Sequence, residues 1–262
     1  MLCREIMEVI EERYPKRFAM EWDNVGLQVG RADKEVQKIY LALDATDEAV
    51  SEAAEWKADM LITHHPMIFK AMKQITDEHF IGKRVLRLIR EDISYYAMHT
   101  NYDVMGMADL AGDYLGLENT SVLEVTSEER DGMPEQGIGR IADLKGPMTL
   151  AECCRFVKER FALPSVKVFG NPDMEVKRIA VFPGSGKGAI EQALEKGADV
   201  LITGDIDHHE GIDAVAQNMA VIDAGHYGVE HIFVEDMRRF CEEKFPQLEV
   251  RTAKICHPFW IS

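Results

Sequence analysis

The sequence predicts an α/β fold of two lobes related by internal duplication of a βαβαβ unit, with three-layer α/β/α architecture and mixed sheets. Three observations predict it. Short β-rich runs alternate with amphipathic helical patterns, a seven-residue pattern recurs in both halves, and polar side chains follow corresponding strands. The length of 262 residues is that of about two domains, at roughly 150 residues each.

The first half of the chain alternates predicted strands and helices. Apolar runs predict strands at residues 39–43, 60–63 and 94–98. Helical periodicity predicts helices at residues 47–56, around residues 85–90, and after Tyr102, where the pattern carries Leu110, Ala111, Tyr114 and Leu115.

The second half repeats this order. Strands are expected at residues 179–182, 200–203 and 220–223. Helices are expected at residues 189–195, near 213–217, and from 229 to 245, where Ile232, Phe233, Phe240 and Cys241 have core spacing. Thr149 is the expected N-cap of a further helix running to Phe161, with Glu152 as its capping-box partner.

A repeat relates the two halves. Residues 57–63 (KADMLIT) align with residues 197–203 (GADVLIT), an offset of 199 − 59 = 140, and the same offset places Ile39 on Ile179. A pattern of this kind is also common in unrelated buried strands. However, a histidine lies four residues before an acid after the third strand of each half, at His99/Asp103 and His226/Glu230, and this match argues against chance.

Composition and charge restrict the classes of function. Thirty Lys and Arg residues against 46 Asp and Glu residues give a formal charge of −16, which repels phosphate backbones and argues against non-specific nucleic-acid binding. An anionic substrate therefore needs a local positive charge, which a metal centre supplies. The charged N-terminus is no signal peptide, and no apolar run is long enough for a membrane span. Five cysteines without a CxxC pair fit reduced thiols, so a cytoplasmic protein is expected.

Candidate metal ligands follow the predicted strands. His64 and His65 come directly after a buried strand, and Pro66 favours a turn that lets both imidazoles address one site. In open α/β sheets the carboxyl ends of the parallel strands face the ligand crevice. Asp103 has an alternative interpretation as the cap of the helix that follows it. Glu230 can alternatively be an acid in the first turn of its helix, where the helix dipole favours a negative charge.

Together these side chains form a mixed set of nitrogen and oxygen donors. They are His64, His65, Asp103, His226 and Glu230. Because one divalent ion usually takes about three or four protein ligands, five suggest two ions that share carboxylates. The donor types suit Zn, Mn, Fe or Co better than Ca or Mg, without choosing among them.

Motifs along nearly the whole chain resemble the Nif-three-like family, whose members are often labelled GTP cyclohydrolase I type 2 homologues or dinuclear metal-centre hexameric proteins. The resemblance rests on residues 21–30 (EWDNVGLQVG), 62–66 (ITHHP), 99–103 (HTNYD), 203–205 (TGD) and 223–230 (DAGHYGVE). It implies a dinuclear metal site between two duplicated lobes and a toroidal homohexamer. The implied ligands are the five residues named above.

The resemblance also bears on the domains and on further site residues. The acid-rich stretch 127–137, with Pro134, is the best boundary candidate, which gives lobes of residues 1–126 and 127–234. The resemblance implies that the C-terminal segment, residues 235–262, returns to the first lobe. His99 and His209 are candidates for proton transfer, with a structural histidine as the equal alternative, and His208 stands where many members have Tyr.

Two functions from different classes follow. The first is a dinuclear metal-dependent hydrolase, of GTP cyclohydrolase type or acting on another nucleotide-like small molecule, in which metal-bound hydroxide attacks carbon or phosphorus. The alternative is a non-catalytic metal-binding protein that serves as a carrier, a store or an interaction scaffold. Two weaker features remain open: the glycine-rich residues 184–188 fit a structural turn better than a phosphate loop, and residues 22–24 either line the cavity or pack.

Overall fold

The computed structural model describes residues 1–129, 132 and 134–260. Within this part of the chain there are two compact units. The first unit comprises residues 1–102 and 233–256, and the second unit comprises residues 103–232 with the residues from 257 onward. The units therefore divide at Tyr102/Asp103, whereas the predicted lobes divide at residues 126/127.

The stretch 127–137 connects two paired strands of the second unit. Strand β5 (Ser121–Ser127) and strand β6 (Gln136–Thr149) are antiparallel neighbours. Residues 130, 131 and 133 of this stretch lie outside the described residues. Acidic residues and proline suit any solvent-exposed connection, so their composition does not distinguish a hairpin from a domain linker.

The first unit contains a mixed sheet with strand order β1-β4-β3-β2-β11, counted over the described residues. Its strands are β1 (Gly26–Val29), β2 (Lys38–Ala42), β3 (Met60–Thr63), β4 (Ser94–Ala97) and β11 (Glu249–Thr252). The last four run parallel, and β1 is antiparallel to β4. The C-terminal strand β11 thus pairs with β2 of the N-terminal segment.

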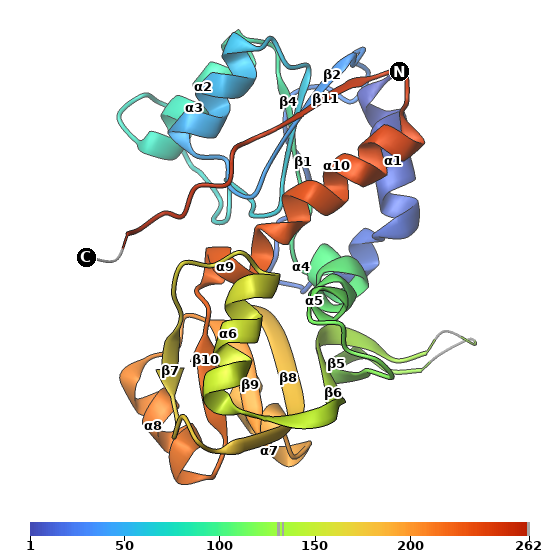
Figure 1. The fold of residues 1–262 in the computed structure, drawn as a ribbon. Coiled ribbons are helices and arrows are strands. Elements are labelled where there is room, and N and C mark those ends of the chain that lie inside the picture. Colours follow the sequence, from blue (N-terminus) through green and yellow to red (C-terminus); the bar gives the residue numbers. More distant parts are fainter. Residues whose placement is uncertain (130–131, 133, 261–262) are drawn as a thin grey trace. The chain divides into compact units, whose positions relative to one another are not determined.

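Helices cover both faces of this sheet. Figure 1 shows α2 (Asp47–Glu55) and α3 (Phe80–Arg90) on one face, and α1 (Cys3–Arg13) and α10 (Ile232–Lys244) on the other. Side chains alternate along a strand, so each strand contributes to both apolar layers. Strands β3 and β4 are buried along their whole length, which accounts for their continuous apolar runs in the sequence.

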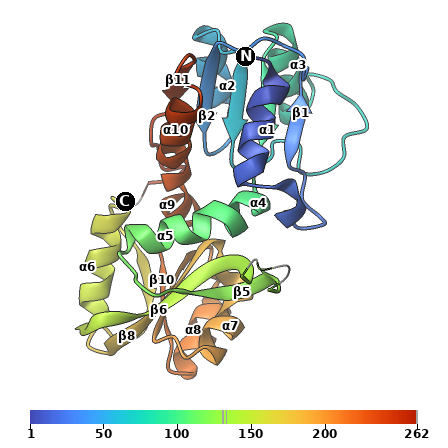
Figure 2. The same cartoon turned by 90° about the vertical axis from the view of Figure 1, so that its right-hand side faces the viewer.

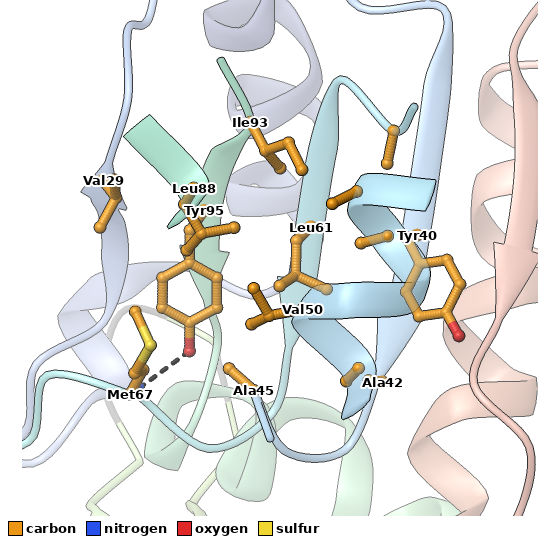
Figure 3. Close-up of a cluster of buried hydrophobic side chains, with 14 of the residues drawn as sticks. Val29, Tyr40, Ala42, Ala45, Val50, Leu61, Met67, Leu88, Ile93 and Tyr95 are labelled. Carbon is orange, nitrogen blue, oxygen red and sulfur yellow. Dashed lines mark hydrogen bonds between the residues drawn. The ribbon is translucent and has the colours of Figure 1, made fainter. Parts of the chain in front are cut away.

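The apolar layer beneath α2 and α3 also positions the loop that follows β3. Tyr95, Leu61, Val50 and Leu88 pack in this layer (Figure 3). The buried Tyr95 hydroxyl donates to the His65 carbonyl oxygen at 3.0 Å and accepts from the Met67 amide at 2.9 Å. The loop that carries His65 is therefore fixed from within the core.

The second unit has a mixed sheet of its own, with strand order β5-β6-β8-β9-β10-β7 over the described residues. The remaining strands are β7 (Lys167–Phe169), β8 (Glu175–Ser185), β9 (Val200–Gly204) and β10 (Ala220–Asp223). Strands β8, β9 and β10 are parallel. Figure 2 shows α6 (Leu150–Arg160) on one face and α7 (Ile190–Glu195) and α8 (His208–Ala216) on the other.

The internal duplication extends to individual hydrogen bonds. In the first unit, Asp59 Oδ2 accepts from the Gln37 and Lys38 amides at 2.9 and 3.0 Å. In the second unit, Asp199 Oδ2 accepts from the Lys177 and Arg178 amides at 2.7 and 2.8 Å. All three pairs keep the offset of 140 residues, so the repeated aspartate ties the start of one strand to the start of its neighbour in both units.

The helices follow the predicted periodicity, with two differences. Thr149 and Glu152 form the predicted capping box of α6. Between Thr100 and Tyr114 the helical stretch contains a π-helical turn, Asp103–Met107, between α4 (Thr100–Tyr102) and α5 (Ala108–Tyr114). The helix predicted for residues 229–245 is two helices, α9 (His226–Glu230) and α10, which are separated at His231. Of the helices in the described residues, none has the length and apolar character that a membrane span needs.

Candidate metal centre

Three histidines of the first unit lie together at the carboxyl ends of neighbouring strands. His64 and His65 directly follow β3, and His99 follows β4 by two residues. A ligand nitrogen from each lies within 4.8 Å of the others. The imidazole centroids are 4.8 Å apart for His64 and His65, and 5.3 and 5.5 Å from each of these to His99. We call these residues the histidine cluster.

Each imidazole of the histidine cluster has its Nδ1 atom hydrogen-bonded to an oxygen acceptor. His64 donates to the Met98 carbonyl at 2.9 Å. His65 donates to the Asp44 carboxylate at 2.8 Å, and His99 donates to the Asp23 carboxylate at 2.9 Å. These acceptors assign the proton to Nδ1 and the lone pair to Nε2, which is the tautomer that binds a metal through Nε2.

Asp23 anchors the cluster on the side of His99. Its side chain is fully buried and also accepts from the Thr100 amide at 2.9 Å and from the Thr100 hydroxyl. Burial by itself would raise the pKa of Asp23, but the hydrogen bonds from His99 and Thr100 lower this pKa to about 2. Asp23 is therefore a carboxylate at all ordinary pH values, and it fixes the orientation of the His99 ring.

A second candidate group lies on α9 of the second unit. His226 and Glu230 are one helical turn apart, and His226 Nε2 lies 3.1 Å from Glu230 Oε2. His226 Nδ1 is 2.7 Å from Asp205 Oδ2, which follows strand β9. The Glu230 side chain is buried, whereas His226 is about one-third exposed. The imidazole thus has a carboxylate on each side.

These two carboxylates control the protonation of His226. Burial would lower the pKa of His226, but Glu230 and Asp205 outweigh it and raise this pKa to about 9. In the metal-free chain His226 is consequently an imidazolium at neutral pH. A metal ion that binds Nε2 displaces a proton from that position, so its binding strengthens as the pH rises.

Glycines leave space for the Glu230 carboxylate and for the backbone at the start of α9. Gly184 has a positive φ of 79°, and a Cβ atom there would lie 2.8 Å from Glu230 Oε1. At Gly204 a Cβ atom would lie 2.4 Å from the His226 amide nitrogen. Gly184 was predicted only as part of a turn. It has a second role, because it lets β8 end against the candidate ligand.

The remaining predicted site residues are placed as follows. Asp103 is buried and begins the π-helical turn of the second unit. His209 is exposed in the first turn of α8, with its ring centroid 5.1 Å from that of the equally exposed His208. Of the two histidines predicted to transfer protons, His99 lies in the histidine cluster and has a fixed carboxylate partner.

Sequence reasoning did not assign three carboxylates that orient the imidazoles. Asp23 and Asp205 lie inside motifs that it singled out, and Asp44 directly follows the first predicted strand. Asp23 is 76 residues from His99, and Asp44 and Asp205 are each 21 residues from their histidines. For Asp44 and Asp205 the available signal was an acid just after a buried strand, at the same sheet edge as the histidines, whereas Asp23 follows no strand and offered no such signal.

The donor sets of both units suit a divalent transition metal. Imidazole nitrogen and carboxylate oxygen are ligands typical of Zn, Fe, Mn and Co sites. Hydrogen bonds from the second nitrogen of a ligand imidazole to carboxylate or carbonyl oxygen are typical of metal-binding histidines. The donors present in each unit, the histidine cluster in the first and the His226–Glu230 pair in the second, are therefore of the kind that a metal ion binds.

Known proteins resemble this chain over almost its full length. A GTP cyclohydrolase 1 type 2 homolog of Clostridium acetobutylicum is 36% identical over 251 residues, covering 95% of this chain and 92% of the relative. A protein of the same name from Streptococcus pneumoniae is 38% identical over 241 residues, covering 90% of this chain and 88% of the relative.

Structural comparison agrees with these sequence relationships. The crystal structure of a Bacillus cereus protein related to NIF3 matches with a TM-score of 0.89 and 26% identity, covering 100% of this chain and 99% of that one. The family model described as Duf34/NIF3 (NGG1p interacting factor 3) matches residues 1–258. A match of this extent confirms the resemblance noted from the motifs, and the chain belongs to the Duf34/NIF3 family.

Proposed function

We propose that this chain is a dinuclear metal-dependent hydrolase in which His64, His65, Asp103, His226 and Glu230 hold two divalent ions. The observation that carries the proposal is that His64 and His65 lie side by side, each with Nδ1 hydrogen-bonded to an oxygen acceptor, which is the tautomer that binds a metal through Nε2. The His226–Glu230 pair supports it, because a carboxylate is buried against an imidazole.

The proposed chemistry is hydrolysis at carbon or phosphorus. When bound, two divalent ions activate water as a nucleophile and stabilise the oxyanion that develops. His99 is suited to move a proton, because its hydrogen bond to Asp23 holds its ring in one orientation. We propose His99 for this role, with His209 as the second candidate on α8.

The substrate class is proposed from the relatives. Curated relatives are named GTP cyclohydrolase 1 type 2 homolog, which points to GTP or another nucleotide-like small molecule. The charge of −16 adds a physical argument, since an anionic substrate requires the positive charge that bound ions provide. We further propose a cytoplasmic homohexamer, as the family motifs imply, whose mass light scattering measures directly.

Metal analysis combined with turnover tests the proposal. Protein purified without added metal should contain about two ions per chain, and the metal-loaded protein should hydrolyse GTP or a member of a nucleotide panel. His64→Ala and His226→Ala should each lower metal content and abolish turnover. His208→Ala is the matched control, because His208 is an exposed histidine outside both candidate groups.

The same measurements separate the hydrolase from the alternative function. A carrier, store or scaffold would bind the ions, exchange them readily and tolerate His99→Ala. A hydrolase would retain its ions and lose rate in His99→Ala without losing metal. Two ions per chain with no turnover on any substrate of the panel would contradict the hydrolase, and no metal at all would contradict both functions.

A further inference from the structure

Two large aromatic side chains of the first unit are exposed beside the histidine cluster. Trp22 is 60% exposed and Phe69 is 49% exposed. Their ring centroids are 5.7 Å apart, and the His99 ring lies 5.9 Å from Trp22 and 6.4 Å from Phe69. We call Trp22 and Phe69 the aromatic pair. Exposed aromatic surface beside a polar cluster is typical of a binding site rather than of a core.

Hydrogen bonds hold the two loops of the aromatic pair together. Asn24 Nδ2 donates to the Ile68 carbonyl at 2.6 Å, and the Ile68 amide donates to Gln28 Oε1 at 3.0 Å. Gln28 Nε2 in turn donates to the Asn24 carbonyl at 2.5 Å. Asp23, the residue next to Trp22, is bound by His99 and Thr100. The loops that carry the two rings are thus held in place before any ligand arrives, which reduces the entropy lost on binding.

We propose that the aromatic pair binds the planar heterocyclic ring of the substrate, so that the bond to be hydrolysed is presented to the histidine cluster. This inference rests on the proposed function and specifies its substrate as a ring-bearing molecule. Trp and Phe faces stack on any flat heterocycle without needing a particular hydrogen-bond pattern. The aromatic pair accordingly selects for a ring, and other contacts select which ring.

The spacing of the aromatic pair defines how the ring binds. A sandwiched ring needs about 7 Å between its neighbours, twice the carbon contact distance of about 3.5 Å. The centroids of Trp22 and Phe69 are closer than this, and their planes are inclined by 51°. The substrate ring therefore stacks on an exposed face of one side chain and meets the other at its edge, a favourable aromatic geometry.

Tryptophan fluorescence tests ring binding separately from catalysis. The chain has three tryptophans, so W56F/W260F leaves Trp22 as the only tryptophan whose emission is followed. Guanosine 5′-monophosphate should quench this emission saturably, whereas ribose 5-phosphate, which lacks only the ring, should not. Adding Phe69→Ala should weaken the guanosine 5′-monophosphate affinity about tenfold, the effect of removing one stacking partner. Phe80→Ala, which removes another exposed ring of the first unit, should leave the affinity unchanged.

Steady-state kinetics provides the second test. Trp22→Ala should raise KM for a nucleotide substrate about tenfold with little change in kcat, and Trp22→Phe should restore most of the loss. Equal quenching by ribose 5-phosphate, or none by guanosine 5′-monophosphate, overturns the inference even if hydrolysis is observed. A change in oligomer mass for Trp22→Ala also overturns it, because a second copy then covers the aromatic pair. Absence of turnover with intact ring binding overturns the hydrolase alone.

Discussion

Asp23 shows how a single buried carboxylate links stability to pH. Its pKa is about 2 in the folded chain and about 3.8 in the unfolded chain, so it contributes about 2 kcal/mol above pH 4. Because the folded pKa is the lower one, this stability is lost as the pH falls from about 4 through about 2. We expect Asp23→Asn to destabilise the protein by this amount at pH 7 and by much less at pH 2.

Chemical denaturation at several pH values measures this effect. Asp33→Asn is the control, because Asp33 is an exposed aspartate of the same unit. A constant difference between Asp23→Asn and the unsubstituted chain from pH 7 to pH 2 would show that Asp23 contributes packing and not charge.

Gly184 is a second residue whose effect is local. Alanine at this position would combine a positive φ with a Cβ atom 2.8 Å from Glu230 Oε1, so the carboxylate or the strand end must move. We expect Gly184→Ala to lower stability by about 1–3 kcal/mol and to reduce metal content. Gly188→Ala is the matched control, since its Cβ would meet open space. Thermal denaturation measures the stability of both variants, and metal analysis measures their metal content. An unchanged metal content in Gly184→Ala would contradict the role of Gly184 in leaving space for the Glu230 carboxylate.

At the residue scale, candidate ligands were easier to identify from the sequence than the partners that orient them. His64 and His65 could be found because two adjacent imidazoles after an apolar strand need an explanation. Asp44 could not be assigned, because a single aspartate after a strand is common in turns and its partner His65 is 21 residues away. Only the folded chain shows which acid faces which imidazole.

At the scale of elements, Tyr95 connects strand β4 to the loop after β3. Its hydroxyl contacts the Thr63 hydroxyl at 2.7 Å as well as the His65 carbonyl and the Met67 amide. Tyr95→Phe leaves these buried groups without that partner, which costs about 1–3 kcal/mol. We expect lower stability together with weaker metal binding, because the His65 carbonyl then keeps only its bond from the Thr63 hydroxyl and the loop is held less firmly.

Tyr96→Phe provides the comparison for this prediction. Tyr96 is equally buried on β4, but its hydroxyl bonds to Glu11 of α1 at 3.2 Å, remote from the loop. Its loss should reduce stability without changing metal affinity. Calorimetric titration with Zn²⁺ and thermal denaturation distinguish the two variants, and equal metal affinities would show that the loop after β3 keeps its shape without Tyr95.

The elements that the sequence predicted are those with strong apolar runs. The parallel strands β2, β3, β4, β8, β9 and β10 were all expected from such runs. The edge strands β1 and β7 were not, because Gly26–Val29 and Lys167–Phe169 are short and only partly apolar. The break at His231 was also missed, since the apolar spacing continues from α9 into α10 and periodicity alone does not reveal it.

At the scale of the whole molecule, the first unit is completed by the end of the chain. Strand β11 pairs with β2 from Val250 opposite Ile39 to Thr252 opposite Leu41, more than 200 residues apart in sequence. Such pairing is hard to infer from local pattern, and the family motifs, not periodicity, implied that the C-terminal segment returns. Bringing such distant segments together costs chain entropy, so this edge strand is expected to form late in folding.

The repeated aspartates offer a test of the duplication across the molecule. Asp59→Ala removes an acceptor from two backbone amides of the first unit, and Asp199→Ala does the same in the second. Each should cost about 1–3 kcal/mol and speed amide exchange only within its own unit, at the starts of β2 and β8 respectively. Asp59→Ala should cost more, because the nearly buried Lys34 ammonium lies 3.6 Å from Asp59. Hydrogen exchange with mass spectrometry measures the exchange rates in both units, and each variant serves as the control for the other. Faster amide exchange in both units of either variant would show that the two units unfold together.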